Sequence, residues 1–248
     1  MAPGASARVP FVTSTAAGAL QNPLLSVVMP AYNERETIDE IVRRVLAVPL
    51  RIELIVVDDG STDGTRERLQ ELQRELGFTL LLQPANAGKG AALRTGFAKI
   101  SGDIVVIQDA DLEYFPEEYP ALIELIRAGL ADVVYGSRFL GRHRVFLFTH
   151  YVGNRALTLL TNVLYNTMLT DMETCFKAMR VSVLRSMTLK SNHFGVEPEL
   201  TAKIFKRRFR VYEIPITYNG RGYDEGKKIT WVDGIDAVWT LFKYRFTE

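Results

Sequence analysis

The chain alternates between short apolar runs and longer stretches in which apolar residues recur every three or four positions. The short runs predict strands that are buried on both faces, and the longer stretches predict amphipathic helices. In 38–48, for example, the apolar positions fall on one helical stripe. The strands are predicted at 24–29, 52–58, 78–83, 103–109 and 132–136, and the helices at 38–48, 65–76, 89–100, 116–129 and 232–244.

Strand and helix follow one another with short connections, which is the order expected of an α/β protein. The predicted fold is a Rossmann-like, mostly parallel sheet with helices on both faces. Sheets of this kind bind ligands at the carboxyl ends of their strands. The residues that follow each strand are therefore the first candidates for a functional site.

Two helix starts carry polar residues that are typical of caps. Asn33, with Glu36 three positions later, matches a capping box for the first predicted helix. Ser61 or Thr62 is expected to cap the second predicted helix. In both cases a side-chain oxygen would accept a hydrogen bond from a backbone N–H at the helix start.

The beginning of the chain has a different composition. Residues 1–23 are rich in small residues and proline, and they contain no apolar stretch long enough for a signal peptide. We expect a disordered tail there, with a short regulatory segment as the alternative. From Leu24 the strand–helix pattern runs on without an internal repeat, so 24–248 is expected to form one domain.

Composition narrows the class of protein. The 248 residues carry 30 Lys and Arg against 29 Asp and Glu, a net charge of +1, so no nucleic-acid partner is expected. The single cysteine, Cys175, excludes an intrachain disulfide and fits a reducing, cytoplasmic compartment. No uncharged apolar run approaches the roughly 18 residues that a membrane span needs, which predicts a soluble or peripheral protein.

The strongest chemical signal is Asp109-Ala110-Asp111, directly after the fourth predicted strand. Side chains two positions apart on an extended segment point the same way, so both carboxylates are expected to reach one divalent cation. Mg²⁺ or Mn²⁺ suits such oxygen ligands, with Glu113 as a third ligand if the segment stays extended. The alternative is a solvated turn, but the position after a buried strand favours the metal site.

The second predicted strand ends in Asp58-Asp59-Gly60. Turn formation explains Gly60 but not two adjacent acids at the end of a buried strand. A carboxylate in that position can accept hydrogen bonds from a nucleoside base or ribose.

Gly88-Lys89-Gly90 follows the third predicted strand and invites comparison with phosphate-binding loops. Leu93 stands where the dinucleotide motif needs its third glycine, and Gly90 stands where a P-loop needs Ser or Thr. Neither of those two classes is supported. Lys89 nevertheless lies near a helix start, where it can meet a phosphate.

Five strings occur at the strand ends in a characteristic order and spacing: VVMPAYNE, IVVDDGSTDGT, NAGKGAALRTG, VVIQDADLEYFPE and DVVYGSRF. Together they resemble the family 2 glycosyltransferases of the GT-A fold. Three later strings, TCFKAMR, EIPITYNGR and GKKITWVDG, are similar to the dolichyl- or polyprenyl-phosphate mannosyl- and glucosyltransferase branch. The resemblance covers about residues 24–246 and implies a GT-A catalytic domain over 24–248.

This resemblance implies an inverting, metal-dependent transfer of a hexose from GDP-mannose or UDP-glucose to a polyprenyl or dolichyl phosphate. The implied cofactor is Mg²⁺ or Mn²⁺, held by Asp109, Asp111 and Glu113. The implied partners are the nucleotide sugar and the lipid phosphate, at the cytoplasmic face of a membrane. A homodimer and a membrane-anchored partner are both left open.

The resemblance also implies roles for individual residues. Catalytic roles fall to Asp109, Asp111, Arg138 and Arg221, and the acceptor phosphate is expected to meet Ser137 and Arg138. A basic loop at Lys227-Lys228 is expected to close on the phosphates. The nucleotide sugar is expected to contact Pro30, Ala31, Tyr32, Glu34, Asp58, Asp59, Lys89, Asp109, Ala110, Asp111, Arg221 and Lys227.

The acceptor has alternatives. A phosphate monoester is largely anionic at pH 7 and attacks with little help, whereas a hydroxyl acceptor needs a general base. Glu197 and Glu199 are the candidates for that base, although they also suit the first turn of a helix. A non-catalytic nucleotide-sugar-binding module is the remaining alternative. Glu113 replaces a Gln that many mannosyl members carry, which leaves the identity of the donor open.

Two apolar segments also have two interpretations each. Segment 141–170 is either an interfacial element that receives a lipid acceptor, with Arg142 or Arg144 in a basic pocket, or an ordinary core helix. The helix at 232–244 is expected to pack on the sheet, to lie in a membrane surface or to pair with another subunit.

Overall fold

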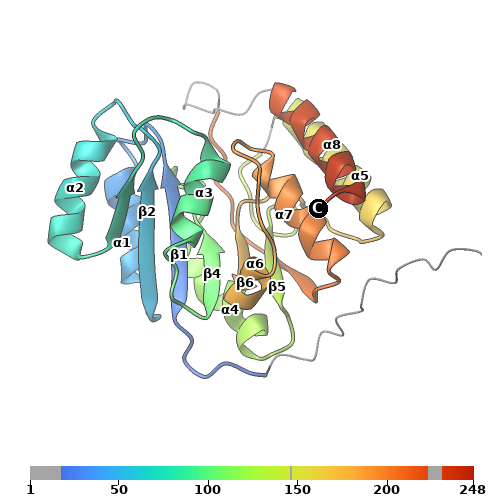
Figure 1. The fold of residues 1–248 in the computed structure, drawn as a ribbon, viewed down its shortest axis with the longest axis horizontal. Helices are drawn as coiled ribbons and strands as arrows, with labels where there is room; N and C mark the ends of the chain where they lie inside the picture. Colours follow the sequence, from blue (N-terminus) through green and yellow to red (C-terminus); the bar gives the residue numbers. More distant parts are fainter. Residues whose placement is uncertain (1–17, 146, 223–230) are drawn as a thin grey trace, which may run out of the picture.

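The computed structural model describes residues 18–145, 147–222 and 231–248 (Figure 1). Within these residues one seven-stranded sheet has the order β3-β2-β1-β4-β6-β5-β7. The strands are β1 (Leu25–Ala31), β2 (Ile52–Asp58), β3 (Thr79–Leu82), β4 (Ile104–Ile107), β5 (Val133–Ser137), β6 (Lys177–Arg180) and β7 (Val211–Pro215).

The sheet is mostly parallel, as predicted. Strand β1 pairs in parallel with β2 and with β4, so that the carboxyl ends of these strands meet at one edge. Strand β6 runs antiparallel between β4 and β5. The sequence did not predict β6 or β7. Strand β6 is fully buried although it begins with Lys177 and ends with Arg180, and β7 is a partly exposed edge strand.

Helices cover both faces of the sheet. The core on one face combines side chains of the sheet with those of α1, α2 and α4, and the core on the other face does so with α3, α6 and α7. The helices are α1 (Ile38–Ala47), α2 (Thr65–Leu76), α3 (Lys89–Phe97), the 3₁₀ turn η1 (Pro116–Glu118), α4 (Tyr119–Arg127), α5 (Phe148–Tyr165), α6 (Val181–Arg185), α7 (Val196–Lys206) and α8 (Trp231–Phe246).

Both predicted helix caps are wrong. Helix α1 begins after Thr37 and α2 begins after Gly64, and neither start has a side-chain cap. Instead, the backbone N–H of Asn33 donates to Oγ of Ser61 (3.0 Å), and the backbone N–H of Thr62 donates to Oδ1 of Asn33 (2.9 Å). The polar residues expected to cap helices therefore join the loop after β1 to the loop after β2.

Part of the expected N-terminal tail lies against the domain. The backbone N–H of Leu20 donates to the carbonyl of Arg127 (2.8 Å), and its side chain packs on the core. Arg180 donates to the carbonyl of Gly18 (3.0 Å). Residues 1–17 lie outside the described part of the chain.

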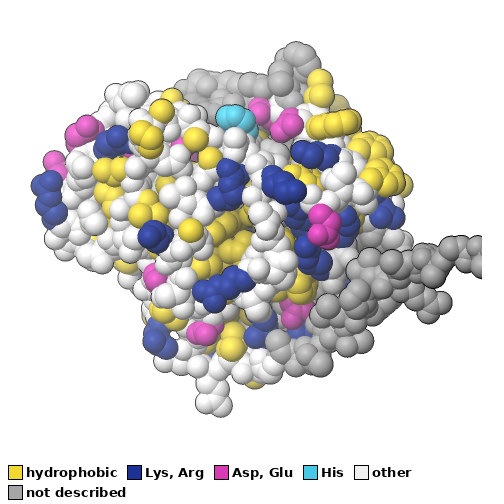
Figure 2. All heavy atoms as spheres, viewed as in Figure 1, with side chains coloured by type: hydrophobic (Ala, Val, Ile, Leu, Met, Phe, Trp, Pro, Cys, Tyr) yellow, Lys and Arg dark blue, Asp and Glu magenta, His cyan; other side chains and the backbone are white. Residues whose placement is uncertain are grey.

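Helices α5 and α8 pack side by side at one end of the molecule (Figure 1). Both leave large apolar side chains exposed: Phe148 is 77% exposed and Trp239 is 65% exposed. Hydrophobic side chains gather over α8 at the upper right of Figure 2. Helix α5 is therefore not an ordinary core helix. In the described ranges, no helix combines the length and apolar character required to cross a bilayer.

Candidate active site

A cavity of about 960 Å³ opens at the carboxyl ends of the parallel strands. It is lined by segments that follow β1, β2, β3, β4 and β5, and its far wall comes from α5 and α8. The predicted residues that the structure brings to this cavity are Pro30, Ala31, Tyr32, Glu34, Asp59, Lys89, Asp109, Ala110, Asp111, Glu113, Arg138 and Arg221.

Two predicted residues are turned elsewhere. Asp58 is buried and accepts hydrogen bonds from Nε of Arg66 (2.7 Å) and from the backbone N–H of Ser61 (3.3 Å). Ser137 is buried, and its hydroxyl shares a hydrogen bond with that of Thr170 (2.7 Å). Neither lines the cavity, so neither is placed to meet a ligand directly. Lys227 and the loop around it lie outside the described residues.

Asp59, which was predicted to contact the nucleotide sugar, binds the backbone of the loop after β3. Its two carboxylate oxygens accept hydrogen bonds from the backbone N–H groups of Ala87 (2.9 Å) and Gly88 (2.8 Å). The loop after β3 is thereby tied to the end of β2, and the start of α3 is held at the cavity.

Lys89, the first residue of α3, reaches into the cavity toward Asp109. Its Nζ lies 2.7 Å from Oδ1 of Asp109, 2.9 Å from Sγ of Cys175 and 3.5 Å from Oε1 of Glu197. Burial alone would lower the pKa of Lys89, but Asp109, Cys175 and Glu197 outweigh it and raise that pKa well above its usual value. Cys175 thus lies at the cavity as well as packing against the core.

Asp111 belongs to a second charged group, centred on Arg221. The guanidinium of Arg221 lies 3.1 Å from each carboxylate oxygen of Glu34 and 3.3 Å from Asp111. The Glu113 carboxylate accepts hydrogen bonds from the backbone N–H of Arg221 (2.7 Å) and from the hydroxyl of Tyr218 (2.5 Å). Burial, together with the charges of Asp109 and Glu113, raises the pKa of Asp111 to about 8.

Of the three carboxylates predicted to bind a divalent cation, those of Asp109 and Asp111 suit such a site and that of Glu113 does not. Ionised Asp109 and Asp111 repel each other in a buried site, and a hard cation with oxygen ligands would relieve that repulsion. Among the described residues, however, no three acidic, histidine or cysteine side chains are grouped to hold a metal. Glu113 is engaged by Tyr218 and Arg221 instead. The donor set therefore suits an ion that takes two ligands from Asp109 and Asp111 and the rest from phosphate oxygens and water.

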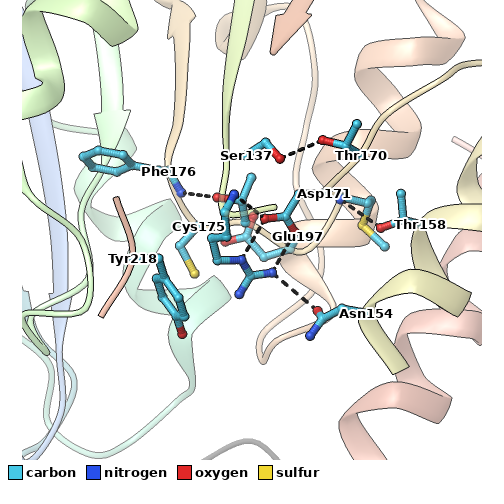
Figure 3. A network of polar contacts seen from close by, with 12 residues as sticks. Ser137, Asn154, Thr158, Thr170, Asp171, Cys175, Phe176, Glu197 and Tyr218 are labelled. Carbon is cyan, nitrogen blue, oxygen red and sulfur yellow. Dashed lines mark hydrogen bonds and ion pairs between the residues drawn. The ribbon is translucent and has the colours of Figure 1, made fainter. Parts of the chain in front are cut away.

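Arg138 also lines the cavity, and Figure 3 shows Asp171, Asn154 and Tyr218, which contact it. Arg138 donates three hydrogen bonds to the carboxylate of Asp171, from its Nε (2.8 Å), its Nη2 (2.7 Å) and its backbone N–H (2.9 Å). Nη2 also donates to Asn154 of α5 (3.4 Å), and the guanidinium lies 5.2 Å from the centre of the Tyr218 ring. Burial would lower the pKa of Arg138, but Asp171 keeps it well above its usual value.

The two glutamates considered as general bases are both in the first turn of α7, as the alternative interpretation expected. Glu199 does not line the cavity; it accepts hydrogen bonds from the backbone N–H groups of Lys190 (2.9 Å) and Ser191 (2.7 Å) and pairs with Lys203. Glu197 lines the cavity but forms an ion pair with the buried Lys177. Both carboxylates are thus ion-paired with buried lysines.

Glu173 also lines the cavity, and the sequence did not single it out. Its Oε1 is buried and has no hydrogen-bond partner within the described part of the chain. Burial is the largest cause that raises the pKa of Glu173, to about 7. Its own segment, DMETCFK, contains no sequence signal for a place at the cavity.

The raised pKa of Glu173 predicts a pH dependence of stability. A carboxyl whose pKa is 4.5 in the unfolded chain and about 7 in the folded protein stabilises the fold below pH 4.5 and loses that contribution as the pH rises through 7. Glu173→Gln is therefore expected to be more stable than the wild type at pH 8, by up to about 3 kcal/mol. Denaturant titrations at pH 4.5 and pH 8 check this; equal wild-type-to-variant differences at both pH values would contradict it.

Comparison with known proteins agrees with this geometry. The family described as Glycosyl transferase family 2 matches residues 26–188, about two thirds of the chain. Dolichol-phosphate mannosyltransferase from Pyrococcus furiosus is 32% identical over 89% of this chain and 64% of its own length. Undecaprenyl-phosphate 4-deoxy-4-formamido-L-arabinose transferase from Edwardsiella ictaluri is 32% identical over 82% of this chain and 62% of its own. The chain thus spans less than two thirds of these relatives.

Solved structures extend the comparison to the fold. Glucosyl-3-phosphoglycerate synthase from Mycobacterium tuberculosis, crystallised with Mn²⁺, UDP and phosphoglyceric acid, superposes with a TM-score of 0.72 and 25% identity. The match covers 91% of this chain and 80% of the synthase. The same enzyme crystallised with Mg²⁺ and UDP gives a TM-score of 0.70. The mostly parallel sheet, the acidic strand ends and the family match lead to one conclusion: the chain belongs to glycosyl transferase family 2.

Proposed function

We propose that this chain transfers a hexose, with inversion, from a nucleotide diphosphate sugar to a polyprenyl phosphate in the presence of Mg²⁺ or Mn²⁺. GDP-mannose and UDP-glucose are the two candidate donors. The observation that carries the proposal is a single cavity that is lined by two separate groups of basic side chains, each held by carboxylates, which are called poles below. The first pole, at the acidic strand ends, contains Lys89 and Arg221, and the second is Arg138.

The first pole suits the donor diphosphate. When bound, the divalent ion would be held by Asp109 and Asp111 and would act as a Lewis acid toward the leaving phosphate. Arg221 and Lys89 supply positive charge beside the same carboxylates. Charge-assisted hydrogen bonds from these side chains favour the anion that leaves when the sugar–oxygen bond breaks.

The second pole suits an anionic acceptor. Arg138 is fixed by Asp171 through Nε and Nη2, which leaves Nη1 without a hydrogen-bond partner among the described residues. A phosphate monoester is largely ionised at neutral pH and requires no general base. The pairing of Glu197 and Glu199 with lysines favours this acceptor over a hydroxyl, which would need one.

The exposed flank beside the cavity supports a lipid-linked acceptor. Helices α5 and α8 contribute Gly153, Ala156, Ala237 and Val238 to the cavity wall and also carry exposed Phe148 and Trp239. An apolar flank next to an anion-binding pole matches an amphiphile with a phosphate head and a hydrocarbon tail. We therefore propose peripheral contact with a membrane surface at this flank.

Donor binding tests the proposal first. Titration calorimetry with a panel of GDP- and UDP-sugars, each with and without Mn²⁺, is expected to reveal one nucleotide class whose binding requires the metal. Transfer from that donor to a short polyprenyl phosphate in detergent micelles is then expected, with an uncharged polyprenol as the matched control acceptor.

Two results would reject the proposal. Absence of donor binding with and without metal would remove the nucleotide-sugar site. In the second, the donor binds with metal and its hexose is transferred to a sugar or small-molecule hydroxyl but not to the lipid phosphate. That result would reject the lipid phosphate as the acceptor in favour of the hydroxyl. Tight binding with no transfer to any acceptor would favour a binding module.

A further inference from the structure

We propose that Glu173 recognises the transferred hexose, by accepting a hydrogen bond from one of its hydroxyl groups. This inference rests on the proposed function and deepens it, because it assigns to one side chain the choice between sugars that differ in a single hydroxyl. The ligand class is a neutral, hydroxyl-bearing pyranose.

Glu173 lies along the chain between a residue that binds Arg138 and one that contacts Lys89. Two residues earlier in the chain, Asp171 holds Arg138. Two residues later, Cys175 contacts Lys89 (2.9 Å). In the proposed reaction the sugar lies between the leaving diphosphate and the attacking phosphate. Glu173 lines the same cavity, and we infer that it faces the part that the sugar would occupy.

The carboxyl group of Glu173 has one unpaired oxygen. Oε1 is buried without a hydrogen-bond partner from residues 18–145, 147–222 or 231–248, although buried polar atoms in folded proteins almost always have one. Leaving such a group unpaired has a substantial cost in free energy, which a ligand that donates a hydrogen bond would remove. A sugar hydroxyl is a donor of this kind.

The charged neighbours of Glu173 are paired with one another. Lys177 and Arg138 act on Glu173 with positive charge and Glu197 and Asp171 with negative charge. Lys177 and Arg138 are already paired, with Glu197 and Asp171 respectively. A fully ionised phosphate has no proton to donate to the unpaired oxygen, whereas every hydroxyl of the hexose has one.

The test compares donors with and without the sugar, using the full chain and Mn²⁺. Calorimetry measures the dissociation constants of the nucleoside diphosphate, of the matching nucleotide sugar and of its deoxy analogues. For the wild type, removal of one particular hydroxyl is expected to weaken binding roughly 10- to 100-fold. Glu173→Ala is expected to bind the intact nucleotide sugar as weakly as the wild type binds that deoxy analogue. The variant should no longer distinguish the two.

Two controls accompany this measurement. Glu173→Gln keeps the shape of the side chain and guards against loss of folding, which thermal unfolding monitors; we expect it to show an intermediate loss of sugar affinity. Glu124→Ala removes an exposed glutamate of α4 that is paired with Arg127 and should change none of the affinities. Binding of the nucleoside diphosphate should stay within about twofold in all variants.

The outcomes separate this inference from the proposed function. Equal weakening of the nucleoside diphosphate and the nucleotide sugar in Glu173→Ala would overturn the inference alone. Unchanged sugar affinity with a large loss of turnover would also overturn it, because it would indicate proton transfer. Failure of the wild type to bind any nucleotide sugar would overturn the proposed function, and the inference with it.

Discussion

Asp111→Asn is expected to lower the rate of sugar transfer at saturating donor by at least about 10²- to 10³-fold. The substitution removes one of the two carboxylates proposed to hold the divalent ion, and so weakens the stabilisation of the leaving diphosphate. Single-turnover transfer at increasing Mn²⁺ measures the loss, and the apparent metal affinity in the presence of nucleotide should fall with it.

The stability of the Asp111→Asn variant distinguishes a loss of metal binding from misfolding. Because burial and neighbouring carboxylates raise the pKa of Asp111 to about 8, an amide at this position should not destabilise the metal-free protein at pH 7. Glu113→Gln is the matched control, since Glu113 is held by Tyr218 and Arg221, and we expect a smaller loss of rate and little change in metal affinity. An Asp111→Asn protein with wild-type turnover would disprove the proposed metal site.

Asp171→Ala is expected to lower the free energy of unfolding by about 3–5 kcal/mol. Asp171 is fully buried and accepts three hydrogen bonds from Arg138, so its removal leaves a buried guanidinium without a compensating charge. Urea denaturation followed by circular dichroism measures the change.

A matched control lies at the other end of β5. Asp132 accepts hydrogen bonds from the backbone N–H, Nε and Nη2 of Arg210, in the same pattern as Asp171 with Arg138. The Arg210 side chain is 30% exposed, against 10% for Arg138, so water can solvate Arg210 after Asp132→Ala. The buried Arg180, whose Nε lies 4.0 Å from Asp132, keeps its hydrogen bonds to two backbone carbonyls. We expect the Asp132 substitution to have the smaller effect; equal losses would mean that burial of the arginine is not the cause.

The double variant Arg138→Met, Asp171→Leu tests whether the pair serves function rather than stability. Replacement of both partners by apolar residues should recover part of the stability lost in Asp171→Ala. Transfer to the phosphate acceptor should remain lost, while donor affinity is kept. Recovery of transfer together with stability would show that Arg138 does not bind the acceptor.

The sequence predicted the parallel half of the fold because its signals are local there. Strands β1 and β2 are continuous apolar runs, and each is followed by a helix with a single apolar face. Strand β6 lacked such a signal, because it begins with a charged residue, Lys177. The charge of Lys177 is neutralised by Glu197 from α7. Burial of that lysine follows from a tertiary contact and not from any pattern within the strand.

The residues of the candidate site also fall into those that local sequence signals predict and those that depend on tertiary contacts. Asp59, Asp109 and Asp111 could be predicted because they directly follow buried strands in a parallel sheet. The partners of Arg221 could not, since Glu34 lies 187 positions away along the chain. Asp171 and Glu173 were missed because nothing in their own segment indicates that Arg138 and the cavity lie beside them.

The short stretch from Asp171 to Cys175 has a geometric consequence for substrate length. One end of it holds Arg138 and the other contacts Lys89, so both poles are attached to the same five residues. Four peptide units extend at most about 14 Å, which sets an upper limit to the separation of the two attachment points. The covalent chain thus limits how far apart the attachment points of Arg138 and Lys89 lie, the two side chains proposed to meet the acceptor phosphate and the diphosphate. A one-residue insertion here would alter that spacing even if every side chain of the cavity were kept.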